Sequence, residues 1–287
     1  MSGALTLALA PASQAVALFG SATGLNSPQG LAFDGGGNLY VNDGSSLFKY
    51  DSSGVFTSVL AIEPSSAGLT FNPSNGNVYV SEGVQVSQVT SGGVSSIFAT
   101  GFFSLRGITV DSSGNLYVAD VGDNTVKKIT SGGIVSTFAS GFNFPTGLAF
   151  DSTGNLYVAN QADVTVSKVT TGGVVSLFAS GFHLPQGLAF DSSDNLYVTN
   201  QSASVSKVTS GGVVSTFISD LTGFGNPQFL AVSGNNLYMS TGGSVTVESL
   251  GVAVPFEFSP AFGLAVLGSL YAGKRLVKRI KGSKVKP

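Results

Sequence analysis

The chain has 287 residues, of which 43% are hydrophobic, only 10% are charged and 39 are glycine, and it contains no cysteine. Without cysteine it can form no disulfide, no thiolate metal site and no cysteine nucleophile. Seven of its 13 basic residues lie in the last 14 positions, so the first 273 residues carry 6 basic and 15 acidic groups, a net charge of −9. A domain with this negative net charge repels the phosphate backbone of DNA or RNA, which argues against nucleic-acid binding.

Residues 1–15 have the features of a truncated signal peptide. A short apolar run over residues 4–10 is followed by small residues at Ser13 and Ala15, which suit cleavage before Val16. No basic residue precedes the apolar run, so we expect the native start to lie further upstream than Met1. The alternative is a disordered, alanine-rich terminus.

From there the chain repeats one unit six times, at intervals of 38 to 42 residues. Each unit contains Gly-Leu-Ala-Phe-Asp or a variant of it, beginning at Gly30, Gly68, Gly107, Gly147, Gly187 and, in a degenerate copy, Phe229. Asn-Leu-Tyr-Val or a variant follows, which places a tyrosine at one position of every unit: Tyr40, Tyr79, Tyr117, Tyr157, Tyr197 and Tyr238. Turn residues such as those at 111–115 separate the two motifs, so each pair predicts a β-hairpin.

A third and a fourth strand complete each unit, as in residues 125–130 and 174–180. Four antiparallel strands in roughly 40 residues are typical of a propeller blade, so the sequence predicts an all-β, six-bladed β-propeller over residues 16–254. After the sixth Asn-Leu-Tyr only one further strand, 244–249, is available. Residues 17–21 match residues 176–180 of a fourth strand. The N-terminal strand is therefore predicted to complete the last blade and close the ring non-covalently.

Residues 255–287 form a different kind of segment. Positions 258–273 contain no charged residue, and a basic cluster beginning at Lys274 and Arg275 follows. This pattern predicts a C-terminal hydrophobic helix close to the length of a membrane span. Basic residues after such a span favour a cytoplasmic end and an external propeller. The alternative is a packed helix with solvated charges.

Polar residues follow the second strand of successive units, at Asp43, Glu82, Asp120, Asn160 and Asn200, with Thr241 in the sixth. We expect them to ring one mouth of the central channel. Carboxylate and amide oxygens suit Ca²⁺, so Asp43, Glu82 and Asp120 are candidate metal ligands, and Asn160 and Asn200 are candidate ligand-binding residues. The alternative is that these side chains cap the adjoining loops.

Arg106 and His183 also stand out. Arg106 is the only arginine before residue 275, and it is expected on the same face as Gln29, Thr146, Gln186 and Gln228, near several phenylalanines. It could bind an anionic ligand or pair with Asp120 or Glu82. His183 is the only histidine and occupies an ordinary loop position of the repeat. Both are candidate ligand-binding residues, and no residue is assigned a catalytic role.

Residues 115–129 resemble the NHL repeat, and the resemblance extends over about residues 17–250. The same superfamily includes gluconolactonase-like and streptogramin-lyase-like propellers. Resemblance to the gluconolactonase-like propellers implies a Glu, Asn and Asp set that binds a divalent ion. Resemblance to the lyase-like propellers implies a catalytic pair of histidine and glutamate. No convincing glutamate partner for His183 is found. The tail resembles a PEP-CTERM sorting signal, with Pro-Phe-Glu-Phe at 255–258 in place of Pro-Glu-Pro. That resemblance implies processing by an exosortase-type enzyme.

Two functions remain open at this point. The first is an exported, cell-envelope-associated binding or scaffold propeller, held to the membrane by its tail, that recognises an extracellular protein, glycan or matrix component with its loop face. The second is a metal-dependent, lactonase-like or lyase-like hydrolase at the mouth of the channel. The scarcity of acid and base side chains favours the first.

Overall fold

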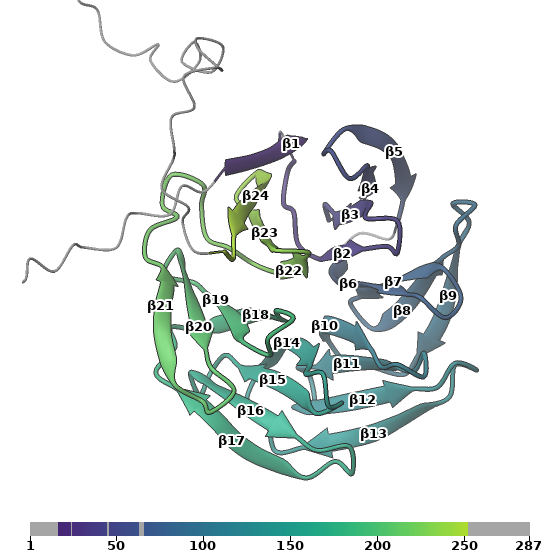
Figure 1. The fold of residues 1–287 in the computed structure, drawn as a ribbon. Coiled ribbons are helices and arrows are strands. Elements are labelled where there is room, and N and C mark those ends of the chain that lie inside the picture. Colours follow the sequence, from purple (N-terminus) through teal and green to yellow (C-terminus); the bar gives the residue numbers. More distant parts are fainter. Residues whose placement is uncertain (1–16, 24, 45, 63–65, 252–287) are drawn as a thin grey trace, which may run out of the picture. The chain divides into compact units, whose positions relative to one another are not determined.

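The computed structural model describes residues 17–23, 25–44, 46–62 and 66–251. Within these ranges six four-stranded antiparallel sheets surround a central axis, which confirms the predicted all-β, six-bladed propeller (Figure 1). No helix in these ranges is long and apolar enough to cross a membrane. The predicted signal peptide and the C-terminal hydrophobic helix lie outside the described residues.

Five blades are built from consecutive strands, numbered from the channel outward. Blade 1 comprises β2 (Leu31–Phe33), β3 (Leu39–Asn42), β4 (Ser46–Tyr50) and β5 (Phe56–Ala61). Blade 2 comprises β6 (Ser66–Asn72), β7 (Asn77–Glu82), β8 (Gln85–Val89) and β9 (Ser95–Thr100). Blade 3 comprises β10 (Leu105–Val110), β11 (Leu116–Asp120), β12 (Thr125–Ile129) and β13 (Val135–Ser140). Blade 4 comprises β14 (Pro145–Phe150), β15 (Leu156–Asn160), β16 (Thr165–Val169) and β17 (Val175–Ser180). Blade 5 comprises β18 (Pro185–Phe190), β19 (Leu196–Asn200), β20 (Ser204–Val208) and β21 (Val214–Ile218).

The sixth sheet combines strands from the two ends of the repeat region. It contains β22 (Leu230–Ser233), β23 (Asn236–Thr241), β24 (Ser244–Ser249) and β1 (Ala17–Thr23), in the order β22, β23, β24, β1. The N-terminal β1 runs antiparallel to β24, with Leu18 opposite Thr246. The outer strand of this sheet therefore comes from the N-terminal part of the chain.

Aromatic side chains fill the space between neighbouring blades. The ring of Tyr117 makes edge contacts with Phe138 of its own blade at 4.9 Å and with Phe150 of the next blade at 5.1 Å, measured between ring centroids. Tyr157 repeats the arrangement with Phe178 and Phe190. The recurrent tyrosine is therefore an inter-blade core residue, which explains its presence in every unit.

The turn between the first and second strands of a blade depends on a hydrogen-bonded aspartate. Asp111 accepts hydrogen bonds from the backbone N–H groups of Ser113 and Asn115 and from the hydroxyl of Tyr117. Asp151 occupies the same position in the next blade. Burial opposes its ionisation, but hydrogen bonds from the Asn155 side chain and from nearby backbone outweigh burial and lower the pKa of Asp151 to about 2. The carboxylates of Asp111 and Asp151 thus stabilise the turns of their own blades.

Glycine at the start of the first strand lets the blades meet around the axis. A Cβ added at Gly147 would fall on the backbone carbonyl oxygen of Gln186, and one at Gly187 would lie 2.8 Å from the Cα of Phe229. Neighbouring backbones are therefore too close for a side chain at either position. The sixth blade departs from this rule, since Phe229 occupies its equivalent position.

Gly147→Ala tests this close approach. We expect the substitution to force adjoining blades apart and to lower the free energy of unfolding by about 1–3 kcal/mol, or about 2–4 °C in Tm for each kcal/mol in a domain of this size. Gly35→Ala is the matched control, because a Cβ at Gly35 meets no atom within 4 Å. Equal Tm values for the two variants, measured by calorimetry, would contradict the explanation.

Candidate functional site

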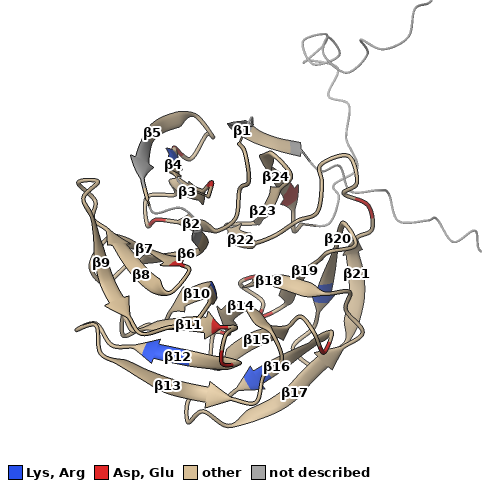
Figure 2. Cartoon of the chain, turned by 180° about the vertical axis from the view of Figure 1, so that it is seen from behind, with Lys and Arg blue, Asp and Glu red and all other residues tan. Residues whose placement is uncertain are grey.

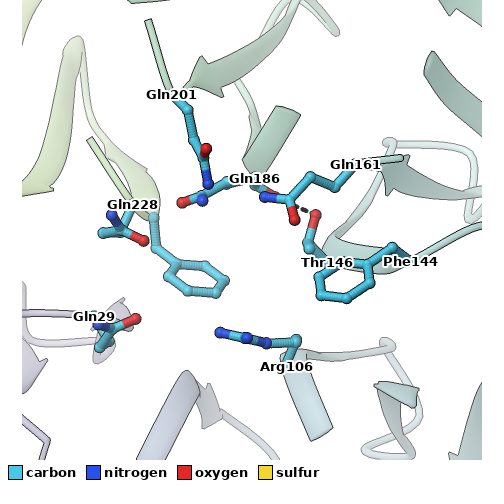
Figure 3. A pocket seen from close by; sticks show the side chains of 9 residues that line it. Gln29, Arg106, Phe144, Thr146, Gln161, Gln186, Gln201 and Gln228 are labelled. Carbon is cyan, nitrogen blue, oxygen red and sulfur yellow. Dashed lines mark hydrogen bonds between the residues drawn. The ribbon is translucent and has the colours of Figure 1, made fainter. Parts of the chain in front are cut away.

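A cavity of about 230 Å³ opens at one mouth of the central channel (Figure 3). Nine residues line it: Gln29, Arg106, Phe144, Thr146, Gln161, Gln186, Gln201, Gln228 and Phe229. Five of the eight glutamines of the chain are therefore gathered at this one place. These nine residues include one cationic group and no carboxylate.

Two positions of the repeat supply most of these side chains. Arg106, Thr146 and Gln186 each precede the first-strand glycine, whereas Gln161 and Gln201 each follow the last residue of a second strand. The two strands run antiparallel, so the start of the first lies beside the end of the second, as Pro145 lies opposite Asn160. Both positions consequently face the same mouth.

Gln186 is the most deeply placed amide of the cavity. Its side chain is about nine-tenths buried, with 9% of the residue surface exposed, and its Oε1 accepts no hydrogen bond from the described residues. Figure 3 shows this amide turned into the cavity, near those of Gln161 and Gln201. A buried amide oxygen without a donor costs about 1–3 kcal/mol, so a donor group on a ligand would be stabilised there.

Arg106 is exposed at the opposite side of the cavity. Its Cζ lies 5.9 Å from the centroid of the Phe144 ring, and it has no ion pair among the described residues. The predicted pairing with Asp120 or Glu82 is therefore not found there. Phe144 holds a left-handed backbone conformation, φ 54°, in which its N–H donates to Oδ1 of Asn124 at 2.9 Å. That contact fixes the aromatic surface beneath the guanidinium.

The three predicted metal ligands accept hydrogen bonds from nearby backbone or side-chain groups. Asp43 accepts the N–H groups of Asn26 and Ser27, and Asp120 accepts those of Phe103 and Ser104. Glu82 accepts hydrogen bonds from the side chains of Gln85 and Ser87. All three residues are buried, with at most 6% of their surface exposed. The contacts of Asp43 and Asp120 are those of the alternative, loop capping, whereas the partners of Glu82 are side chains of β8.

The described residues contain no group of three Asp, Glu or His side chains that could hold a metal ion. The mouth itself offers only amide and hydroxyl oxygens beside a guanidinium, and that positive charge opposes a divalent cation. The donor set thus does not fit the predicted Ca²⁺ site.

The remaining candidates also lie outside the lining of the cavity. Asn160 donates to the hydroxyls of Thr165 and Ser167. Asn200 accepts the backbone N–H of His183 and donates to Ser206. The His183 side chain is exposed, and its backbone carbonyl accepts the N–H of Gln201. Of these contacts, the one to Gln201 joins a candidate residue directly to the lining of the cavity.

Sequence reasoning missed three lining residues. Gln161 and Gln201 come one position after the predicted Asn160 and Asn200, so the correct second strands were identified but not the residue that faces the channel. Phe229 was visible as a departure from glycine in the sixth unit. The expected group of Gln29, Arg106, Thr146, Gln186 and Gln228 does share one face.

Asp120→Ala separates loop capping from metal binding. Removing the acceptor of two loop N–H groups should lower the free energy of unfolding by about 1–3 kcal/mol, by the same amount with CaCl₂ or with EDTA. Asp163→Ala, at an exposed position whose carboxylate accepts a hydrogen bond from Asn143, should cost less than about 0.5 kcal/mol. A Ca²⁺-dependent rise in Tm that disappears in Asp120→Ala would restore the metal site.

Comparison with known proteins agrees with the architecture. Residues 104–129 match the NHL repeat, and no curated protein matches the sequence. A gluconolactonase from Xanthomonas campestris is 17% identical, with a TM-score of 0.70 over 82% of this chain and 89% of that one. Virginiamycin B lyase from Staphylococcus aureus is 16% identical, with a TM-score of 0.62 over 79% of this chain and 81% of that one. At these identities the likeness concerns the fold. The chain is thus a six-bladed propeller that carries an NHL repeat and has gluconolactonase-like and streptogramin-lyase-like structural neighbours.

Proposed function

We propose that this propeller is a binding module that recognises a polar ligand at the amide-lined mouth of its channel. One observation carries the proposal: five glutamines converge on a single cavity, and one of them, Gln186, presents a buried amide oxygen without a donor. Amides donate and accept hydrogen bonds, and they do not transfer protons near neutral pH. Such a lining suits recognition better than acid–base catalysis.

A hydrolase is the second candidate, since the similar solved structures include a gluconolactonase and a lyase. A propeller of this kind can place catalytic groups at its channel mouth. Here the mouth holds glutamine, threonine, arginine and phenylalanine, none of which is an efficient general base at neutral pH. The side chains therefore favour the first candidate, although the fold alone is compatible with both.

We further propose that the protein is exported and associated with the cell envelope, as a scaffold or receptor for an extracellular protein, glycan or matrix component. The signal-like residues 1–15 and the apolar and basic segments of residues 255–287 support this location. The tail would provide the membrane contact and the substrate for an exosortase-type processing enzyme. A PEP-CTERM-like signal is the sequence basis for that last step.

Binding and hydrolysis are distinguished by Gln186→Met, which keeps the size of the side chain and removes its amide. Using the full chain, we expect titration calorimetry with neutral trisaccharides to detect binding by the native protein and at least a ~10-fold weaker Kd for the variant, about 1.4 kcal/mol. Ser176→Ala, on the exposed outer strand β17, is the control. Lactone hydrolysis that is lost in Gln186→Met would favour the second candidate, and native protein that binds no neutral trisaccharide, no acidic trisaccharide and no acidic peptide would contradict the first.

Non-covalent closure of the ring is a further part of this proposal. Phe19 of β1 is 92% buried, with its ring 5.0 Å from that of Tyr238 in the same blade. Tyr238 also contacts Phe33 of blade 1, at 4.7 Å. These side chains belong to one apolar cluster with Leu31 and Leu39 of blade 1. We infer that β1 seals the junction between the last blade and the first.

Phe19→Ala is expected to open this junction and to lower the free energy of unfolding by about 3–5 kcal/mol, because a large buried ring is lost. Leu18→Ala, one residue earlier and half exposed, should change it by less than about 0.5 kcal/mol. Chemical denaturation of both variants provides the measurement. Equal free energies of unfolding for Phe19→Ala and Leu18→Ala would contradict the inference that β1 closes the ring.

A further inference from the structure

We propose that the ligand of the channel mouth is an acidic sugar, with its carboxylate bound by Arg106 and its ring held by the glutamines and two phenylalanines. This inference rests on the proposed binding function and specifies the chemical class of the ligand. Three independent features of the cavity support it: the cation, the amides and the aromatic floor.

The cation is the first feature. Six Lys and Arg side chains lie in the described part of the chain (Figure 2). Four are lysines placed over the recurrent tyrosines: Lys49, Lys128, Lys168 and Lys207. Lys127 pairs with Asp123 at 2.5 Å. Of these six side chains only that of Arg106 lines the mouth. The equivalent position of the other five blades holds glutamine, alanine or threonine.

The Arg106 guanidinium is well suited to a planar anion. It is a fork of five N–H donors that matches a carboxylate with two parallel hydrogen bonds. Contact with Phe144 occupies one face of the group, and no ion pair to the described residues occupies its donors. Among the described residues, the lining contains no Asp or Glu that would compete. A ligand carboxylate would therefore meet a guanidinium that no described carboxylate pairs with.

The amides are the second feature, and they favour a sugar over an acidic peptide. Each sugar hydroxyl donates one hydrogen bond and accepts others, and each glutamine amide does the same through separate atoms. Gln186 contributes the buried Oε1 that has no donor. Gln161 and Gln201 present further amides beside it (Figure 3). The amide N–H donors and carbonyl acceptors of these glutamines therefore suit the hydroxyl groups of a pyranose ring, each of which donates and accepts hydrogen bonds.

The aromatic floor is the third feature. Phe229 lines both the mouth cavity and a narrower space of about 100 Å³ that is otherwise lined by first-strand residues such as Gly107 and Gly147. Its side chain thus lies where the other five blades have only a glycine. Together with Phe144 it offers apolar surface to the C–H faces of a sugar. The cavity is smaller than the roughly 300–1,000 Å³ of drug-sized sites, so it fits a terminal sugar unit.

Arg106→Gln tests the carboxylate contact without disturbing the ring, since glutamine occupies this repeat position in blades 1, 5 and 6. The probes are trisaccharides of galacturonate, glucuronate and mannuronate and their methyl esters, in which a neutral ester replaces each carboxylate on the same sugar ring. With the full-length native chain, we expect at least one acid to bind ~10-fold or more tightly than its ester. In Arg106→Gln we expect that preference to vanish while the ester still binds.

Two further variants make the result specific. Lys128→Gln removes the same charge from a lysine over Tyr117, outside the mouth, and should retain the native preference for the acid. Phe229→Gly restores the residue of the other blades and should weaken the acid and the ester by the same factor. A loss of preference in Lys128→Gln would show that net charge, and not Arg106, is responsible.

The outcomes separate this inference from the function on which it rests. Equal binding of acids and esters by the native protein would overturn the acidic-sugar inference and leave sugar binding intact. No binding of any acidic sugar, neutral sugar or acidic peptide would overturn both. Binding of an acidic peptide that depends on Arg106, without binding of any sugar, would replace the saccharide by a protein partner.

Discussion

The close approach of the first strands around the axis is the constraint on which the rest of the structure depends. A Cβ at Gly147 would collide with the backbone of Gln186 in the next blade, so the innermost strands meet through backbone alone. Apolar side chains then fill the wider spaces further out, where Tyr117 reaches Phe150 across the blade boundary. The first-strand glycine must lie where neighbouring backbones are closest. The residue before this glycine therefore lies at the mouth of the channel.

Repetition explains why so few polar residues are available for function. The turn aspartates are held by local hydrogen bonds, four of the described lysines lie over tyrosine rings, and Asp43 and Asp120 accept loop N–H groups. Each of these contacts occurs in more than one blade because the blades share the same turns and the same packing between sheets. Residues that differ between blades carry the information about a ligand, and Arg106 and Phe229 differ most from their equivalents.

The fold could be predicted from the sequence because the repeat determines it: glycine spacing, strand alternation and the recurrent tyrosine leave little choice of architecture. The site was predicted less completely. Successive strand residues point to opposite sides, so an error of one position exchanges a buried group for a lining group. Asp120 and Asn160 were therefore expected at the mouth, whereas Gln161 lies there. The direction of Phe229 depends on the whole ring and could not be obtained from local pattern.

Charge sets a limit on how the mouth can select its ligand. A body with many more acidic than basic groups repels an anion at distance, which slows encounter. Screening confines that repulsion to about 8 Å at physiological ionic strength. Among the described residues that line the cavity only Arg106 is charged, so attraction begins at contact, where hydrogen-bond geometry also acts. Selectivity for an anion therefore depends on the placement of one guanidinium by Phe144, and a rigid aromatic support is more useful there than additional positive charge.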